Sequence, residues 1–163
     1  IIMGTRSLTY IEESWETAVA DEENNNKVHK TTQNILCMYR QYDGYMSGHG
    51  AELAEFLQDF NIVNGMKLND PPRTANGMGC LAAQLIVHFK ASACKDDGTP
   101  TSEPGGIYVY HPEAKDYGEE FTYTIYTKGK GNIYIRAYDV WAEKVIFDGT
   151  PEELLTKLKL DYA

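Results

Sequence analysis

The sequence has few cysteines, and their spacing excludes the commonest roles of that residue. Cys37, Cys80 and Cys94 are odd in number and show no CxxC or similar ligand spacing, so neither a disulfide framework nor a structural zinc site is expected. Cys37 lies in a strand pattern and Cys80 in a helix pattern, where both are typical of small core residues. These features favour a reducing compartment, the cytoplasm.

Long apolar segments are also missing. No run approaches the roughly 18–20 residues that a membrane-spanning helix requires. The start, IIMGTRSL, lacks the basic region and apolar stretch of a secretion signal, and Met3 could be the natural first residue. The sequence therefore predicts a soluble protein that has no membrane partner.

Charge and motif content exclude further classes. The net charge is −9, so binding to the phosphate backbone of nucleic acids is not expected. The acidic residues gather in two clusters, within 12–23 and within 113–120, which we interpret as solvated faces, with mimicry of DNA as the alternative. The motifs GxSxG, GxxxxGK(S/T) and HExxH and the dinucleotide-binding fingerprint are absent, and no cofactor is expected.

The hydrophobic periodicity predicts a single α+β domain over residues 1–163. Helices are predicted at about 50–60, at about 76–91, and after the capping signal Thr150-Pro151-Glu152-Glu153. Strands are predicted at 4–11, 33–42, 107–110, 120–127, 132–140 and 143–147. Runs of strands beside runs of helices favour a mainly antiparallel sheet with the two central helices packed on one face and a short C-terminal helix. Residues 12–32 are expected to form a mobile loop or loose hairpin, 92–106 a mobile loop, and 61–75 a turn-rich connection.

The most informative segment is the loop between the second strand and the first helix, YRQYDGYMSGHG at 39–50. Loops that are held on a rigid scaffold often carry function. Arg40, together with Tyr42, Ser47 and Gly48, could bind a ligand, because a guanidinium and free amides at a helix start both favour anions. His49 could act as a general acid or base.

Asp43 would then orient the ring of His49. A purely structural interpretation of the loop is also coherent. Asp43 would form an Asx turn in which Gly44 takes a positive φ, Ser47 would cap the helix, and Arg40 would pair with Asp43 or Glu52.

Alternation in the late strands predicts a second candidate surface. Phe121, Tyr123 and Ile125 share one side of the sheet. The opposite side, which we call the tyrosine face, would carry Thr122, Thr124, Tyr126, Tyr134, Arg136 and Tyr138. Tyr108 and Tyr110 could join it. This face could be solvated, could stack nucleic-acid bases, or could form the interface of a homo-oligomer or of a protein partner.

Four segments together resemble a known family. They are MGTRSLTY at 3–10, CMYRQYDGYMSGHGAELAEF at 37–56, NGMGCLAAQLI at 76–86 and PGGIYVYHP at 104–112. The chain resembles a family of small uncharacterised proteins of bacteriophages, including marine ones, and of some bacteria, in which the loop usually reads DGYPSGHG. Met46 stands where that family has proline, which frees one backbone dihedral. The resemblance implies no activity, but it implies a protein of the bacterial or phage-infected cytoplasm.

Two functions are expected from these observations. The first is a non-enzymatic binding or interaction domain that uses the 40–50 loop, the tyrosine face, or both. The alternative is a small hydrolase or transferase with an anionic substrate, in which Arg40 binds the anion, His49 moves the proton and Asp43 orients His49.

Overall fold

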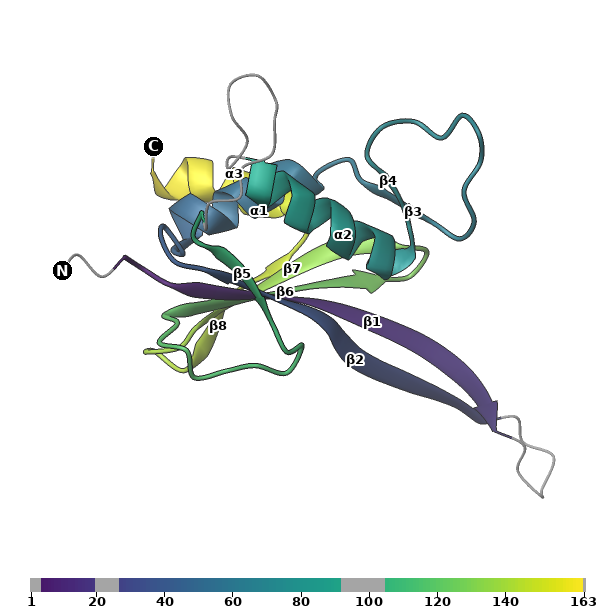
Figure 1. The fold of residues 1–163 in the computed structure, drawn as a ribbon, viewed down its shortest axis with the longest axis horizontal. Coiled ribbons are helices and arrows are strands. Elements are labelled where there is room, and N and C mark those ends of the chain that lie inside the picture. The colour runs from purple at the N-terminus through teal and green to yellow at the C-terminus, as the bar shows by residue number, and fades with distance from the viewer. Residues whose placement is uncertain (1–3, 20–26, 92–104, 163) are drawn as a thin grey trace.

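The computed structural model describes residues 4–19, 27–91 and 105–162 and has an α+β fold (Figure 1). Its strands are β1 (Ser7–Val19), β2 (Lys27–Arg40), β3 (Asn61–Val63), β4 (Thr74–Asn76), β5 (Ile107–Tyr110), β6 (Phe121–Lys128), β7 (Asn132–Asp139) and β8 (Lys144–Gly149). Its helical segments are a π-helical turn η1 (Met46–Gly50), α1 (Ala51–Leu57), α2 (Gly77–Lys90) and α3 (Pro151–Asp161).

Six strands form the main sheet in the order β5-β2-β1-β6-β7-β8. Neighbouring strands are antiparallel except for β1 and β6, which run parallel. The expectation of a mainly antiparallel sheet is therefore confirmed. β3 and β4 form a separate short parallel pair, which lies almost entirely within the segment 61–75 that was expected to be a turn-rich connection.

The main core lies between the sheet and the helices. Buried side chains from α1, α2 and α3 form one cluster with those of the central strands, and Figure 1 shows the three helices on one side of the sheet. Leu53, Leu81 and Leu154 have no exposed surface, and the same is true of Ile125 and Ile135 beneath them. The sheet and helices bury their apolar faces against each other, as a two-layer domain requires.

A connection between strands covers part of the second face of the sheet. The connection 111–120 crosses β1 and β2, where the Tyr10 hydroxyl donates to the carbonyl of Ala114 at 2.5 Å. Beneath it, Leu8, Cys37 and Tyr39 form a small separate core. Figure 1 shows this connection on the side opposite the helices. The tyrosine face on β6 and β7 lies beside the connection.

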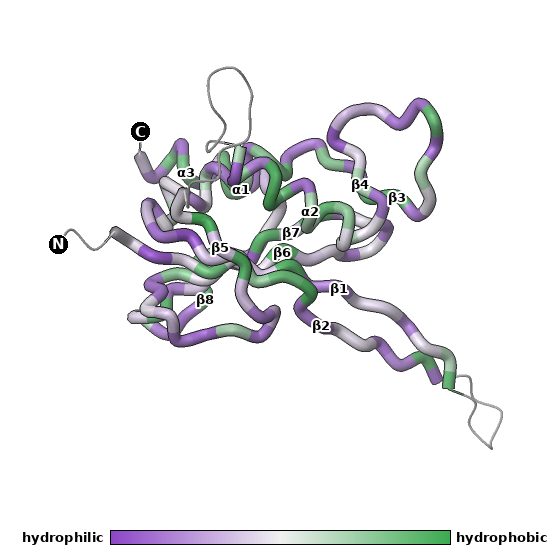
Figure 2. Tube along the Cα trace, in the orientation of Figure 1, coloured by the Kyte–Doolittle hydropathy of each residue, from purple (hydrophilic) through white to green (hydrophobic). Residues whose placement is uncertain are grey.

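The long hairpin of β1 and β2 corrects one prediction. Residues 12–19 and 27–32 are regular strand rather than a mobile loop, so the hairpin interpretation holds for them, whereas 20–26 lie outside the described residues. Figure 2 shows that this arm is largely hydrophilic along its length. The sequence of this arm has no alternation of apolar and polar residues that would have predicted strands there. Of the expected mobile loop at 92–106, residues 92–104 also lie outside the described residues.

The helix boundaries follow local sequence closely except at the end of α1. In α3 the Thr150 hydroxyl accepts from the Glu153 amide and the Glu153 carboxylate accepts from the Thr150 amide, which confirms the capping box. α1 ends three residues before its predicted end. Its last carbonyls accept hydrogen bonds from the guanidinium of Arg73, at 2.9 Å for Phe56 and Gln58, and a bond from outside the helix replaces the capping that a glycine would supply.

Candidate functional site

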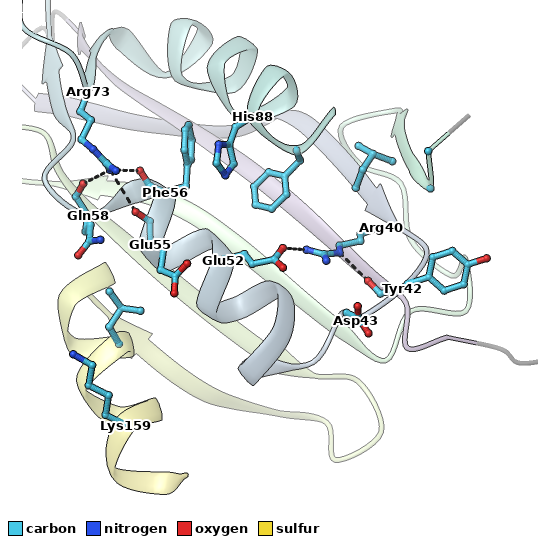
Figure 3. Close-up of a pocket in the computed structure, with 15 residues that line it drawn as sticks. Arg40, Tyr42, Asp43, Glu52, Glu55, Phe56, Gln58, Arg73, His88 and Lys159 are labelled. Carbon is cyan, nitrogen blue, oxygen red and sulfur yellow. Dashed lines mark hydrogen bonds and ion pairs between the residues drawn. The ribbon is translucent and has the colours of Figure 1, made fainter. Parts of the chain in front are cut away.

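The predicted loop borders a pocket of about 1000 Å³ (Figure 3). β2 and the residues after it supply Arg40, Tyr42 and Asp43. The other walls are α1, the C-terminal half of α2, the start of β5, and α3. The pocket therefore lies where the end of a central strand meets all three helices.

Arg40 is the residue that connects the pocket to the interior. Its Nε donates to the carbonyl of Tyr42 at 2.7 Å. Its Nη1 bonds both the carboxylate of Glu52 and, at 3.0 Å, the Nδ1 atom of His49. The guanidinium also lies over the ring of Phe89, 5.9 Å from its centre. Only 15% of the Arg40 side chain is exposed, so most of its donors are committed to the protein.

His49 is fully buried, which the sequence did not indicate. The π-helical turn η1 directs the side chain inward, between the sheet and α2. Its ring makes edge contacts with Phe89 and Tyr123, whose centres lie 5.0 and 5.3 Å away. Nε2 lies 2.7 Å from the hydroxyl oxygen of Thr9 on β1. Both ring nitrogens therefore have protein partners.

The tautomer of His49 follows from these partners. A guanidinium carries donors only, so Nδ1 must accept the hydrogen bond from Arg40. The ring proton then resides on Nε2, which donates to the hydroxyl of Thr9. Burial, and secondarily the charge of Arg40, lower the pKa of His49 well below its ordinary value. His49 is consequently a neutral side chain held inside the fold.

Asp43 does not orient the ring of His49. Its carboxylate lies beside the Tyr45 hydroxyl at 3.4 Å, and only its backbone carbonyl meets His49, accepting from the amide at 2.7 Å. Arg40 and Thr9 hold the ring instead. Asp43 itself adopts a positive φ of 58°, a conformation that Asp tolerates, and this corrects the expectation that Gly44 would take it.

The small residues of the loop are required by close contact rather than by backbone dihedrals. A Cβ on Gly44 would lie 2.8 Å from backbone of Arg6, and one on Gly48 would lie 2.5 Å from the carbonyl oxygen of Asp43. Ser47 is exposed and makes no capping hydrogen bond to η1 or α1. Neither Ser47 nor Gly48 lines the pocket, so of the four predicted ligand-binding residues only Arg40 and Tyr42 do so.

The charges around the pocket balance. Arg40, Arg73 and Lys159 are basic, and three carboxylates, those of Asp43, Glu52 and Glu55, face them. The lining thus has no formal net charge, in a chain whose total is −9. Figure 3 shows Glu52 and Glu55 along one side of α1, with Arg40 and Arg73 near its two ends. A ligand that carries both signs of charge fits such a lining better than a polyanion does.

Aromatic side chains form the apolar part of the lining. His88 stacks on Phe56 with ring centres 4.4 Å apart, and Tyr42 at the rim is 55% exposed. Phe89 lies at the base beside Arg40. Phe89 belongs to the main core and Phe56 packs against it, and nothing in the sequence showed that α1 and α2 leave their edges open to one pocket.

Tyr126 and Tyr134 lie on the tyrosine face as predicted, opposite each other on β6 and β7, with ring centres 5.7 Å apart. The Tyr126 hydroxyl donates to Asp148, which also accepts from Arg136 at 3.2 Å. The Arg136 guanidinium lies over Tyr126, 4.6 Å from the ring centre. This face is therefore a network of polar and aromatic groups in which Tyr126 is buried and Tyr134 and Arg136 are partly exposed. Tyr138 belongs to it through its pairing with Thr122.

No cluster of three or more His, Cys, Asp or Glu side chains suited to a metal ion occurs within 4–19, 27–91 or 105–162. In the same part of the chain, every helix is too short or too polar to cross a membrane. Comparison with protein-family models, with curated proteins and with solved structures gives no match for this chain.

Proposed function

We propose that the chain is a non-enzymatic binding domain whose pocket, beside the 40–50 loop, receives a segment of a protein partner. The observation that carries the proposal is the contrast between the two kinds of group in the loop. Tyr42 and Asp43 line the pocket and are exposed, whereas His49 has no exposed surface. The loop therefore offers a ligand exposed binding groups, and its expected general acid or base is buried.

The lining also suits a peptide that carries side chains of both charges. A pocket of about 1000 Å³ lies at the upper end of the range of small-molecule sites, roughly 300–1,000 Å³, and has room for several side chains. Its balanced charges suit acidic and basic side chains together, and the rings of Phe56 and His88 offer apolar contact area. Aromatic and arginine side chains at such positions commonly dominate binding between proteins.

The alternative, a hydrolase or transferase with an anionic substrate, receives less support from this geometry. A general base must lie within hydrogen-bond reach of the proton that it takes. Both ring nitrogens of His49 are occupied by Thr9 and Arg40. Arg40 in turn is already paired with Glu52, which leaves it less able to clamp an anion.

We further propose that the protein acts in the cytoplasm of a bacterium or of a phage-infected cell. The resemblance of the loop and its flanking segments to phage proteins supports this location. The free thiols of Cys37 and Cys80 are compatible with a reducing compartment.

A selection of random peptides tests the binding function. Peptides displayed on phage would be selected on the immobilised wild-type protein, and synthetic copies of the enriched peptides measured by calorimetry. Glu55 is exposed and lines the pocket, so Glu55→Lys should weaken binding at least about tenfold, roughly the 1.4 kcal/mol that separates decades of affinity.

Glu16→Lys is the matched control, because Glu16 is also exposed but lies on the distant arm. Its affinity for the same peptides should equal that of the wild type. If no peptide is enriched, or if both variants bind every enriched peptide as the wild type does, the pocket is not the binding site.

A further inference from the structure

The outer edge of β8 takes no part in the pocket. β8 is the last strand of the sheet, and among the described residues only β7 pairs with it. An unpaired edge is a template for another strand unless charges or cover protect it. β8 carries three apolar residues in its centre, and Val145 is 51% exposed.

The other free edges of this sheet differ from that of β8. The outer edge of β1 beyond Ile11 carries Glu12, Glu13 and Glu16, and repeated charges of one sign discourage strand addition. β5 begins at Ile107, which lines the pocket. β8 has one basic residue at one end and one acidic residue near the other, so repeated charge of one sign does not protect its edge.

A β-bulge gives β8 an unusual order of side chains. The pairing with β7 shifts by one residue between Ala137 and Tyr138. As a result Ile146 and Phe147, which are consecutive, both pack against the main core. Val145 pairs with Tyr138 on the tyrosine face, and Asp148 pairs with Arg136 on the same face.

The resulting order of sides is symmetric about the centre of the strand. Lys144 pairs with Asp139, and Gly149 pairs with Ile135. The positions of Lys144 and Gly149 therefore both lie on the helix side of the sheet. From Lys144 to Gly149, the first, third, fourth and sixth positions lie on the helix side of the sheet. The second and fifth positions, Val145 and Asp148, lie on the tyrosine face. A regular strand alternates strictly, so it could match only one half of β8. An antiparallel copy of β8 itself matches all six positions.

We infer that β8 pairs with β8 of a second copy of this chain, antiparallel about a two-fold axis between Ile146 and Phe147. In that register Val145 of each copy faces Asp148 of the other, Ile146 faces Phe147, and Lys144 faces Gly149. The contact is isologous and therefore closes as a dimer. The six-stranded sheets join into one continuous sheet.

Charge complementarity supports this register. A Cβ on Gly149 would collide with the carboxylate of Glu153, so that carboxylate lies directly over Gly149. Lys144 of the second copy, placed opposite Gly149, therefore comes beside a carboxylate. The pairing also brings residues just before Lys144 close to residues just after Gly149, and Trp141, which is 82% exposed, gains a neighbour there.

Sedimentation velocity over the micromolar to millimolar range tests the inference. A six-residue edge buries less than a standard interface of about 1,200–2,000 Å², so we expect weak, concentration-dependent dimers. Val145→Glu places a carboxylate opposite Asp148 of the second copy and should raise the dissociation constant at least tenfold. Val145→Lys places an ammonium there and should leave the dimer as tight as, or tighter than, in the wild type.

The two variants change the same exposed position and differ only in the sign of the charge, so each controls for folding of the other. A second readout comes from Trp141 in the Trp15→Phe background, where its fluorescence should shift to shorter wavelength as dimers form. A wild-type protein that stays monomeric throughout, or an equal effect of both charges, overturns the inference.

Discussion

Arg40 and Arg136 lie on opposite faces of the same sheet, and each pairs with one carboxylate. The Arg40 side chain is 15% exposed and also bonds the buried ring of His49. The Arg136 side chain is 40% exposed, and its partner Asp148 is 37% exposed. Water screens the second pair and leaves it little net stabilisation, whereas the first satisfies a buried acceptor. An arginine paired with a carboxylate therefore supports the buried interior at Arg40, whereas at Arg136 it forms a surface ion pair.

Replacing His49 should cause the largest loss of stability. We expect His49→Ala to lower the free energy of unfolding by about 3–4 kcal/mol, because it leaves a cavity between Phe89 and Tyr123 and deprives Thr9 and Arg40 of a partner. Urea denaturation measures the loss. His88→Ala is the matched control, since that ring is exposed and should cost less than about 1 kcal/mol. A loss below about 1 kcal/mol for His49→Ala would instead favour the enzymatic alternative.

Replacing each arginine by methionine compares the two sites directly. Arg40→Met leaves Nδ1 of His49 buried without a donor, which should cost about 2–3 kcal/mol. Arg136→Met removes a screened ion pair and a contact with Tyr126, and should cost at most about 1 kcal/mol. Denaturant unfolding of both variants provides the measurement, and Glu52→Gln separates the exposed carboxylate from the buried acceptor. Equal losses for the two arginine variants would contradict the assigned difference.

The features that the sequence predicted are those set by neighbours along the chain. The capping box of Thr150 and Glu153, the span of α2 and the alternation in β6 and β7 each depend on residues a few positions apart. All three agree with the structure. The tyrosine face was predicted for the same reason, because a period of two fixes which side chains share a face.

The role of His49 depends on distant residues and was not predictable in that way. Thr9 is forty positions away from it, and the π-helical turn that directs the ring inward has no local signature in MSGHG. The end of α1 is likewise determined by Arg73, fifteen residues after Gln58. A histidine among glycines between a strand and a helix is typical of a site, and only the packing of α2 over it shows that it is interior.

The burial of His49 should also make the stability of the protein depend on pH below neutrality. The folded state lowers the pKa of His49, so below the unfolded value of about 6.5 the unfolded chain binds the extra proton. Stability is therefore complete above that pH and falls by up to about 1.4 kcal/mol per unit as the pH decreases. Unfolding measured between neutral and mildly acidic pH should show a shallower slope for His49→Gln. Identical slopes would mean that the ring is protonated inside the fold.

Tyr126, beside Arg136 and Asp148, should make the stability depend on pH in the alkaline range. This should be the smallest of the expected effects. Burial, then the hydrogen bond to Asp148, raise the pKa of Tyr126 to about 12. Because this exceeds the unfolded value of about 10, the folded state keeps a proton that the unfolded state loses, and stability decreases as the pH rises above about 10. Asp148→Asn should lower the pKa of Tyr126, as phenolate absorbance would show, and cost under about 1 kcal/mol at neutral pH. An unchanged tyrosine titration would mean that burial alone protects Tyr126, and the contrast between the two arginine sites would then rest on Arg40 and His49 alone.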